Sequence, residues 1–167
     1  GFVQFAMLTY LPLISLRSAP SLNPGLVVVP LTILWMTLGA FTGVLALRIG
    51  TRPLALAAVL LAAGGAVAVV ISTAYASLLI ASLLAGAAAG LLLIPALLLC
   101  QHAAPRQDVG AATSFAVLMR NFGGAAGAAV TGVLLFEDGV ARTFTWLAVI
   151  AVLAVVPALL LPSPAAE

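Results

Sequence analysis

The chain has 167 residues, of which 65% are hydrophobic and only 6% are charged, and its formal net charge is +2. Soluble domains carry about 25% charged residues, so this composition excludes a water-soluble fold and predicts an integral membrane protein whose first partner is the lipid bilayer. The few charges are too scattered for nucleic-acid binding, and a single cysteine, Cys100, excludes an intrachain disulfide and a thiolate metal cluster. We therefore expect no nucleic-acid partner, no metal and no other cofactor.

Six apolar stretches follow one another along the chain. A helix that crosses a bilayer needs about 20 apolar residues. Charged and turn-forming breaks leave stretches of about this length near residues 1–17, 25–47, 53–72, 76–100, 109–135 and 143–162. We expect an all-α, polytopic membrane helix bundle of six transmembrane helices over residues 1–162, with a short C-terminal tail over 163–167. The first stretch is short for a full span and the chain opens directly in apolar sequence, so we expect Gly1 to lie inside a longer protein.

The expected connections contain turn-forming or charged residues. They are "RSAPSLNPG" (17–25), "RIGTRP" (48–53), "STAYAS" (72–77), "QHAAPRQDVG" (101–110) and "EDGVAR" (137–142). Proline, glycine and asparagine are typical of turns. Asp108 is expected to cap the helix that follows it.

The arginines predict an orientation in the cell (inner or plasma) membrane. Loops 48–53 and 101–108 carry Arg48, Arg52 and Arg106, whereas the connections on the opposite side carry Arg17 and Arg142. Cytoplasmic loops carry an excess of basic residues. This rule places loops 48–53 and 101–108, together with the C-terminus, in the cytoplasm.

Two features recur at matching places in the first and second sets of three stretches. The opening stretch of each set contains a proline, Pro12 or Pro95, and the middle stretch contains a small-residue pair, Gly39/Gly43 or Gly123/Gly127. Broken helices in corresponding positions are typical of inverted-repeat transporters. Glycine and proline are also common in membrane helices generally, so both interpretations remain open.

Three stretches resemble one family of transporters. "YLPLISLRSAPSLNPGLVVVP" looks like an extended turn and a "GLxxLP" helix entry, and "GVLALRIGTRP" resembles a "GxLADRxGRR" turn. "QHAAPRQDVGAATSFAVLMRNFGGAAGAAVTGVLL" is similar to "QNAVPxxxxGxATSxxxFxRxxGGxxGxA" and is the most specific of the three. Together they resemble the 14-helix drug:proton antiporter branch of the major facilitator superfamily. The resemblance covers essentially the whole chain, as the last six of fourteen helices.

The resemblance implies the C-terminal half of a major facilitator fold, built as a 3+3 inverted repeat. It further implies alternating access and multidrug efflux of small, drug-like amphipathic compounds by proton antiport. The partners would be a small-molecule substrate, protons and the missing N-terminal helices of the same transporter. The matching residues of the cytoplasmic loop motif are Gly43, Arg48, Gly50 and Arg52.

Two departures from the family pattern concern charge. Leu47 replaces the acid of the loop motif, so the charge relay attributed to that turn cannot operate here. Asp108, Glu137, Asp138 and Glu167 all lie in expected loops or in the tail. Proton transport needs a protonatable group within the membrane, so the coupling acid would have to come from the missing half.

Arg120 lies about eleven residues into the fifth stretch, roughly 17 Å along a helix axis. Arginine at the centre of a membrane helix costs about 2.5–3.5 kcal/mol on insertion scales. Its side chain could snorkel to the interface, bond to a neighbouring helix, or face a substrate pathway. The candidate pathway residues are Gln4, Tyr10, Trp35, Gln101, Arg120 and Asn121, although Tyr10 and Trp35 are also typical interface anchors.

The remaining candidates are structural. Pro12 and Pro95 are expected to bend helices, and Gly39, Gly123, Gly124 and Gly127 are expected at packing or hinge positions. "DGVAR" (138–142) is one residue too short for the signature of membrane phospholipid-head-group transferases, and a rhomboid-type serine motif is absent. We expect no enzyme. The alternatives to a transporter fragment are a non-transporting six-helix scaffold or subunit, and a half-size transporter that acts as a dimer.

Overall fold

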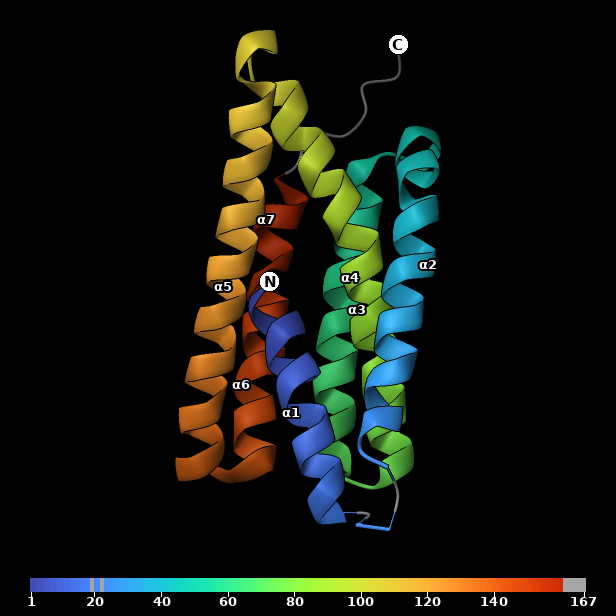
Figure 1. The fold of residues 1–167 in the computed structure, drawn as a ribbon, viewed down its shortest axis with the longest axis vertical. Helices are drawn as coiled ribbons and strands as arrows, with labels where there is room; N and C mark the ends of the chain where they lie inside the picture. The colour runs from blue at the N-terminus through green and yellow to red at the C-terminus, as the bar shows by residue number, and fades with distance from the viewer. Residues whose placement is uncertain (19, 22, 161–167) are drawn as a thin grey trace.

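The computed structural model describes residues 1–18, 20–21 and 23–160, and every regular element within them is helical (Figure 1). The chain order is α1 (Phe2–Ser18), α2 (Gly25–Ile49), α3 (Thr51–Ile71), α4 (Tyr75–Ala103), the 3-10 helix η1 (Arg106–Asp108), α5 (Val109–Glu137), α6 (Gly139–Leu153) and α7 (Val155–Leu159). The expected all-α class is confirmed. The tail over 163–167 and the end of the expected 143–162 helix lie outside the described residues.

Five helical segments of the described chain are long and apolar enough to cross a membrane. They are Gly25–Ile49, Thr51–Ile71, Tyr75–Ala103, Arg106–Glu137 and Gly139–Leu159. The first helix, α1, is shorter, at 17 residues. The described chain is thus a bundle of five to six long apolar helices, compatible with a multi-pass membrane protein, whereas the 3+3 repeat remains a prediction.

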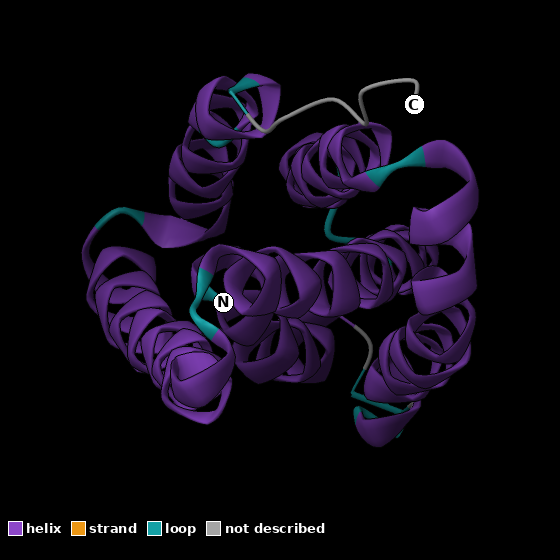
Figure 2. Cartoon of the chain, turned by 90° about the horizontal axis from the view of Figure 1, so that it is seen from above, coloured by secondary structure: helices purple, strands orange, loops and turns teal. Residues whose placement is uncertain are grey.

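Helix α4 lies at the centre of the bundle. It packs against α2 and α3 and also contacts α1 and α5, while α3 packs against α6. Seen from above, the helices lie side by side as a bundle (Figure 2). The largest cluster of buried side chains includes Met7 and Leu11 of α1, Leu78 of α4, and Phe144 and Leu147 of α6. With Leu31 of α2 and Val69 of α3 in the same cluster, the core extends over the first, second, third, fourth and sixth helices.

Small residues let α2 and α4 approach closely. A Cβ atom added to Gly90 would lie 2.8 Å from Cβ of Leu38 and 3.1 Å from the backbone nitrogen of Gly39. Two buried hydroxyls cross the same seam: Thr42 Oγ1 donates to the Gly90 carbonyl at 3.0 Å, and Ser82 Oγ donates to the Val27 carbonyl. Such close contacts and interhelical hydrogen bonds replace the hydrophobic effect as the source of helix association in lipid.

The connections alternate between the two ends of the bundle. Those at residues 49–51 and 103–109 lie at one end, and those at 18–25, 71–75 and 137–139 lie at the other (Figure 1). The arginines expected to share a side of the membrane therefore do share an end of the molecule. Which end is cytoplasmic remains a prediction.

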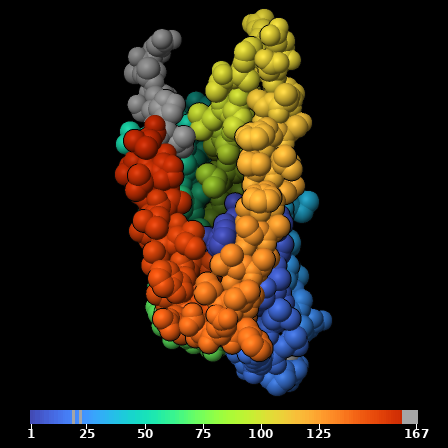
Figure 3. Space-filling view, turned by 90° about the vertical axis from the view of Figure 1, so that its left-hand side faces the viewer, coloured from blue at the N-terminus to red at the C-terminus, as the bar shows by residue number. Residues whose placement is uncertain are grey.

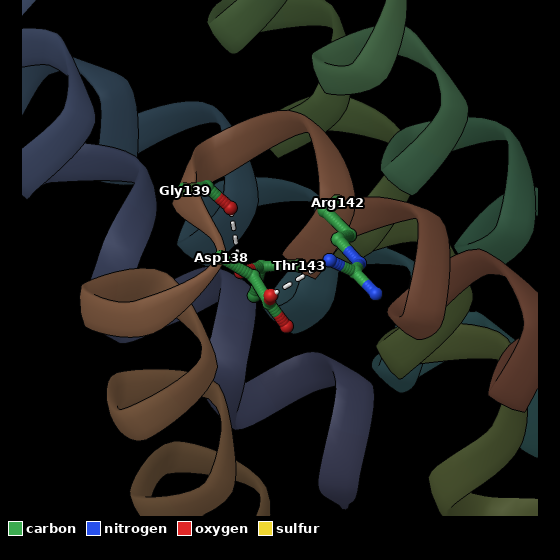
Figure 4. Close-up of polar contacts among 4 residues, drawn as sticks. All are labelled: Asp138, Gly139, Arg142 and Thr143. Carbon is green, nitrogen blue, oxygen red and sulfur yellow. Dashed lines mark hydrogen bonds and ion pairs between the residues drawn. The ribbon is translucent and has the colours of Figure 1, made fainter.

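Two of the connections are shorter in the structure than the sequence predicts. The connection expected over 48–53 is the single residue Gly50, whose φ of 85° lies in a region that favours glycine. The connection expected over 137–142 is a turn at Asp138 and Gly139, where Gly139 has a φ of 78°. Arg142 belongs to the first turn of α6, where its Nη1 atom lies 3.1 Å from Asp138 Oδ1 (Figure 4). The helix thus begins before the charged Arg142, and the i,i+4 ion pair lies across its first turn.

The expected cap on α5 is also wrong. Asp108 stands at the N-cap position, but its side chain makes no capping hydrogen bond. Its backbone nitrogen instead donates to the Pro105 carbonyl at 2.8 Å, as part of η1. The 3-10 turn therefore replaces a side-chain cap at this helix start.

Candidate functional site

The candidate site is built where α1 lies against the glycine-rich face of α5. A Cβ atom on Gly124 would lie 2.7 Å from Cδ2 of Phe5, and one on Gly127 would lie 2.8 Å from the carbonyl carbon of Phe2. Larger side chains would hold the two helices apart. Glycine at both positions therefore brings the first turn of α1 beside Arg120, one turn earlier in α5.

Arg120 joins three helices. Its Nη2 atom donates to Gln4 Oε1 of α1 at 3.2 Å. Its Cζ atom lies 5.3 Å from the ring centroid of Phe5, also in α1, and 5.1 Å from that of Trp35 in α2. Both distances are within the range of cation–π attraction. We call Gln4, Phe5, Trp35 and Arg120 the Arg120 cluster.

The cluster holds more hydrogen-bond donors than acceptors. Among the described residues no carboxylate forms an ion pair with Arg120, and the amide Nε2 of Gln4 is buried without a hydrogen-bond partner. A guanidinium offers five N–H donors, of which one is used by Gln4. A buried donor left unpaired costs about 1–3 kcal/mol. The arrangement is therefore suited to an acceptor that this part of the chain does not supply.

A cavity of about 310 Å³ adjoins the cluster. Gln4 and Arg120 contribute to its wall, and the rest is mainly apolar, with residues such as Val59, Leu93 and Ile150 from α3, α4 and α6. Figure 3 shows the molecule hollowed between α5 and the α6–α7 segment, with α3 and α4 behind. An apolar cavity with a few polar groups at one side is typical of small-molecule sites.

The structure brings together three of the predicted pathway residues, Gln4, Trp35 and Arg120, and leaves the others apart. Tyr10 donates its hydroxyl to the Ala128 carbonyl at 2.8 Å and so joins α1 to α5. Gln101 Nε2 donates to Thr113 Oγ1 at 3.1 Å, and Asn121 is exposed and does not line the cavity. A pathway role for each remains a prediction.

The predicted loop-motif residues lie away from the cluster, around the turn between α2 and α3. Arg48 is exposed and Arg52 is half-buried, and Gly50 forms the turn itself. A Cβ atom on Gly43 would make ordinary contact with Cγ2 of Ile94, at 3.7 Å. The motif thus sits at the end of the bundle rather than at the site.

The predicted hinge and packing residues differ in how tightly they are packed. Pro12 and Pro95 lie inside α1 and α4. A Cβ atom on Gly39 would meet nothing within 4 Å, and one on Gly123 would lie 4.0 Å from the Phe2 nitrogen. Close packing on α5 therefore depends on Gly124 and Gly127 rather than on Gly123.

Two parts of the site were not found from the sequence. Phe5 is an ordinary apolar residue of a membrane helix, and only the packing of α1 on α5 shows that it lies against Arg120. The cavity walls are alanine, valine and leucine side chains that resemble many others in the chain. Neither carries a local signal, because both depend on contacts between distant segments.

Comparison of the chain with protein-family models and with curated proteins finds no match. Within the described residues no group of three or more His, Cys, Asp or Glu side chains could hold a metal ion. The Arg120 cluster and the sequence motifs are therefore the features of this chain that bear on its function.

Proposed function

We propose that this chain is the C-terminal six-helix part of a secondary active transporter of the major facilitator type, which exports small amphipathic compounds by proton-coupled alternating access. One observation carries the proposal. A half-buried arginine within a long apolar helix contacts two neighbouring helices beside a cavity of about 310 Å³ and has no acid partner among the described residues. Charged residues at such positions in membrane proteins typically mark substrate or ion pathways.

The contacts of the Arg120 cluster are compatible with alternating access. Arg120 of α5 contacts Gln4 and Phe5 of α1 and Trp35 of α2, so a change in the tilt of one helix alters contacts with the other two. Pro12 and Pro95 interrupt the hydrogen bonding of α1 and α4 and supply bending points. The coupling carboxylate belongs to the helices that would precede this chain in the whole transporter. We propose neither an enzymatic reaction nor a cofactor.

Conservative substitution of Arg120 tests the proposal in the native polypeptide. Lysine keeps the charge but loses the planar fork that lies between two aromatic rings and bonds Gln4. We expect Arg120→Lys to lower proton-driven efflux by about tenfold or more at normal expression, as loss of a charge-assisted hydrogen bond predicts. The matched control is Arg142→Lys, since Arg142 lies in an exposed ion pair, and its efflux should be unchanged.

Two results would contradict this proposal. Normal efflux by the Arg120→Lys variant would show that the guanidinium of Arg120 is not needed in the substrate pathway. Absence of proton-driven transport by the native polypeptide, with Arg120→Ala affecting only stability, would support the scaffold interpretation instead. A tag on the C-terminus, followed by sizing of the membrane-bound product, shows which polypeptide to assay: a full transporter of this type is much longer than 167 residues.

A further inference from the structure

We propose that Gln101 and Thr113 are positioning residues: the hydrogen bond between them fixes the rotation of α5 on α4 and thereby directs Arg120 into the bundle. This inference deepens the proposed function, and its transport test rests on that function. It follows from the contact itself, from the small side chains beside it and from the spacing of residues along α5. All the bonded groups belong to α4 and α5, which follow each other in the chain.

The contact is a chain of two hydrogen bonds at the end of the bundle where α4 leads into α5 (Figure 1). Gln101 Nε2 donates to Thr113 Oγ1 at 3.1 Å, and the same hydroxyl donates to the Val109 carbonyl at 2.8 Å. Because its proton is used on Val109, the Thr113 oxygen serves as the acceptor for Gln101. Within the described residues this is the one side-chain hydrogen bond that joins α4 to α5.

The side chains next to the contact are too small to fix the rotation of α5 by packing. Gly110, Ala111 and Ala112 precede Thr113 in the first turn of the helix. A Cβ atom added to Gly110 would meet nothing within 4 Å. A hydrogen bond depends on direction as well as distance, whereas contacts between methyl groups depend mainly on distance. The bond between Gln101 and Thr113 therefore selects one rotation of α5 where packing does not.

The spacing of residues along α5 carries this selection to Arg120. Thr113 and Arg120 are seven residues apart, so they lie about 10 Å apart along the axis and within about 20° of the same direction. Gly124 and Gly127 continue this face, and a Cβ atom added to either would overlap atoms of α1. A rotation of α5 by about 100° would bring Asn121 to the direction of Arg120. The bond at Thr113 thus determines which of the two polar side chains faces the bundle.

Substitutions that preserve side-chain size separate this bond from packing. Thr113→Val and Gln101→Leu each remove the bond and keep a side chain of similar size, while Thr113→Ser keeps the hydroxyl. The matched control is Thr145→Val in α6, because Thr145 is exposed and its hydroxyl bonds the Ala141 carbonyl of its own helix, at 2.8 Å. Thr145→Val therefore loses the same kind of local bond as Thr113→Val and no bond between helices.

Nitroxide scanning of the native-length protein measures the rotation of α5. Every native cysteine is replaced by serine, and spin labels are attached in turn to residues 114–119, 121 and 122. Their collision rate with molecular oxygen, which is concentrated in lipid, is recorded in nanodiscs. In a helix this rate oscillates with a period of 3.6 residues, and the phase of the oscillation gives the direction that faces lipid. We expect the same change of phase in Thr113→Val, Gln101→Leu and the double variant, and the wild-type phase in Thr113→Ser and Thr145→Val.

Efflux by the same variants tests whether this placement of Arg120 matters for transport. We expect efflux to fall by about two- to tenfold in Thr113→Val and in Gln101→Leu, the range that loss of one hydrogen bond predicts. The double variant should be no worse than either single variant, because both remove the same bond. Thr113→Ser and Thr145→Val should retain normal efflux.

The wild-type phase in both Thr113→Val and Gln101→Leu would overturn the inference, and so would an equal change of phase in Thr145→Val. If Thr113→Val is not recovered from the membrane, Gln101→Leu decides the question alone. These outcomes retain the transporter as long as the native polypeptide exports its substrate. A changed phase without any transport by the native polypeptide would instead support the role of Gln101 and Thr113 and refute the transporter.

Discussion

Individual residues hold α1 against α5, and this contact in turn places Gln4 and Phe5 of the Arg120 cluster beside Arg120. Tyr10 bonds the Ala128 backbone, and the glycines of α5 leave room for Phe2 and Phe5. These contacts are short-range and each can be changed alone. Single substitutions can therefore separate steric fit from hydrogen bonding at this seam.

Substitution of Gly123 or Gly127 by alanine tests the steric fit between α1 and α5. A Cβ atom on Gly127 would lie 2.8 Å from the carbonyl carbon of Phe2, whereas one on Gly123 would lie 4.0 Å from the Phe2 nitrogen. We expect Gly127→Ala to lower the free energy of unfolding by about 1–3 kcal/mol, a typical cost of overpacking. Gly123→Ala should change it little. Denaturation in mixed micelles measures both, and equal stability of the two variants would contradict the close approach of α1 to α5.

Substitution of each of the two tyrosines by phenylalanine tests how much hydrogen bonding contributes to stability. The Tyr10 hydroxyl donates to Ala128 at 2.8 Å, while the buried Tyr75 hydroxyl has no partner among the described residues. Tyr10→Phe should cost about 0.5–1.5 kcal/mol of unfolding free energy, as is usual for one hydrogen bond. Tyr75→Phe should be neutral or stabilising. A larger loss of unfolding free energy for Tyr75→Phe than for Tyr10→Phe in the same assay would show that the Tyr10 hydrogen bond does not hold α1 against α5.

At the scale of helices, the turn between α2 and α3 depends on one backbone conformation. Gly50 has φ 85° and ψ 166°, a region that is essentially restricted to glycine and costs other residues about 1–3 kcal/mol. We expect Gly50→Ala to destabilise the bundle by that amount. The matched control is Gly110→Ala in the first turn of α5, where an added Cβ meets nothing within 4 Å. A fall in the thermal unfolding midpoint for Gly110→Ala equal to that for Gly50→Ala would contradict this assignment.

The helices could be predicted from the sequence largely because the bilayer imposes their length. Long apolar runs must be helical in lipid, where every backbone group needs an internal partner. The ends are less predictable: the charges of Glu137 and Arg142 predict a loop, yet Glu137 is the last residue of α5 and Arg142 lies in the first turn of α6. Charge shows where a chain leaves the apolar core, and not where a helix ends.

The site was predictable only in part, for a related reason. A charged residue in an apolar stretch is conspicuous, so Arg120 was singled out, and Gln4 and Trp35 were candidates because they are polar or amphipathic. Phe5 and the cavity walls are as apolar as the lipid-facing residues around them. Their role depends on which helix faces pack together, and single-sequence patterns do not contain that information.

At the scale of the whole molecule, the outer surface requires a bilayer. Large apolar side chains are strongly exposed on several helices, for example Met36 at 75%, Phe122 at 70% and Phe136 at 93%. Exposed apolar surface of this kind is rare on soluble monomers. Apart from Arg120, the charged side chains of the described residues lie at or near the two bundle ends, so the charges at those ends indicate how the bundle is oriented.

Orientation is the prediction that follows from this distribution. One end carries Arg48, Arg52 and Arg106, the other carries Arg17 and Arg142, and the positive-inside rule assigns the first end to the cytoplasm. Cys100 is the only cysteine of these 167 residues, so a background in which it and any cysteine elsewhere in the native polypeptide are replaced by serine accepts one reporter at each end: Gln107→Cys and Asn23→Cys, both at exposed positions. A membrane-impermeant maleimide should label Asn23→Cys in intact cells, and Gln107→Cys only after the cytoplasmic face is opened in inverted vesicles. The opposite pattern would place Arg48, Arg52 and Arg106 on the outer side of the membrane and contradict the positive-inside assignment.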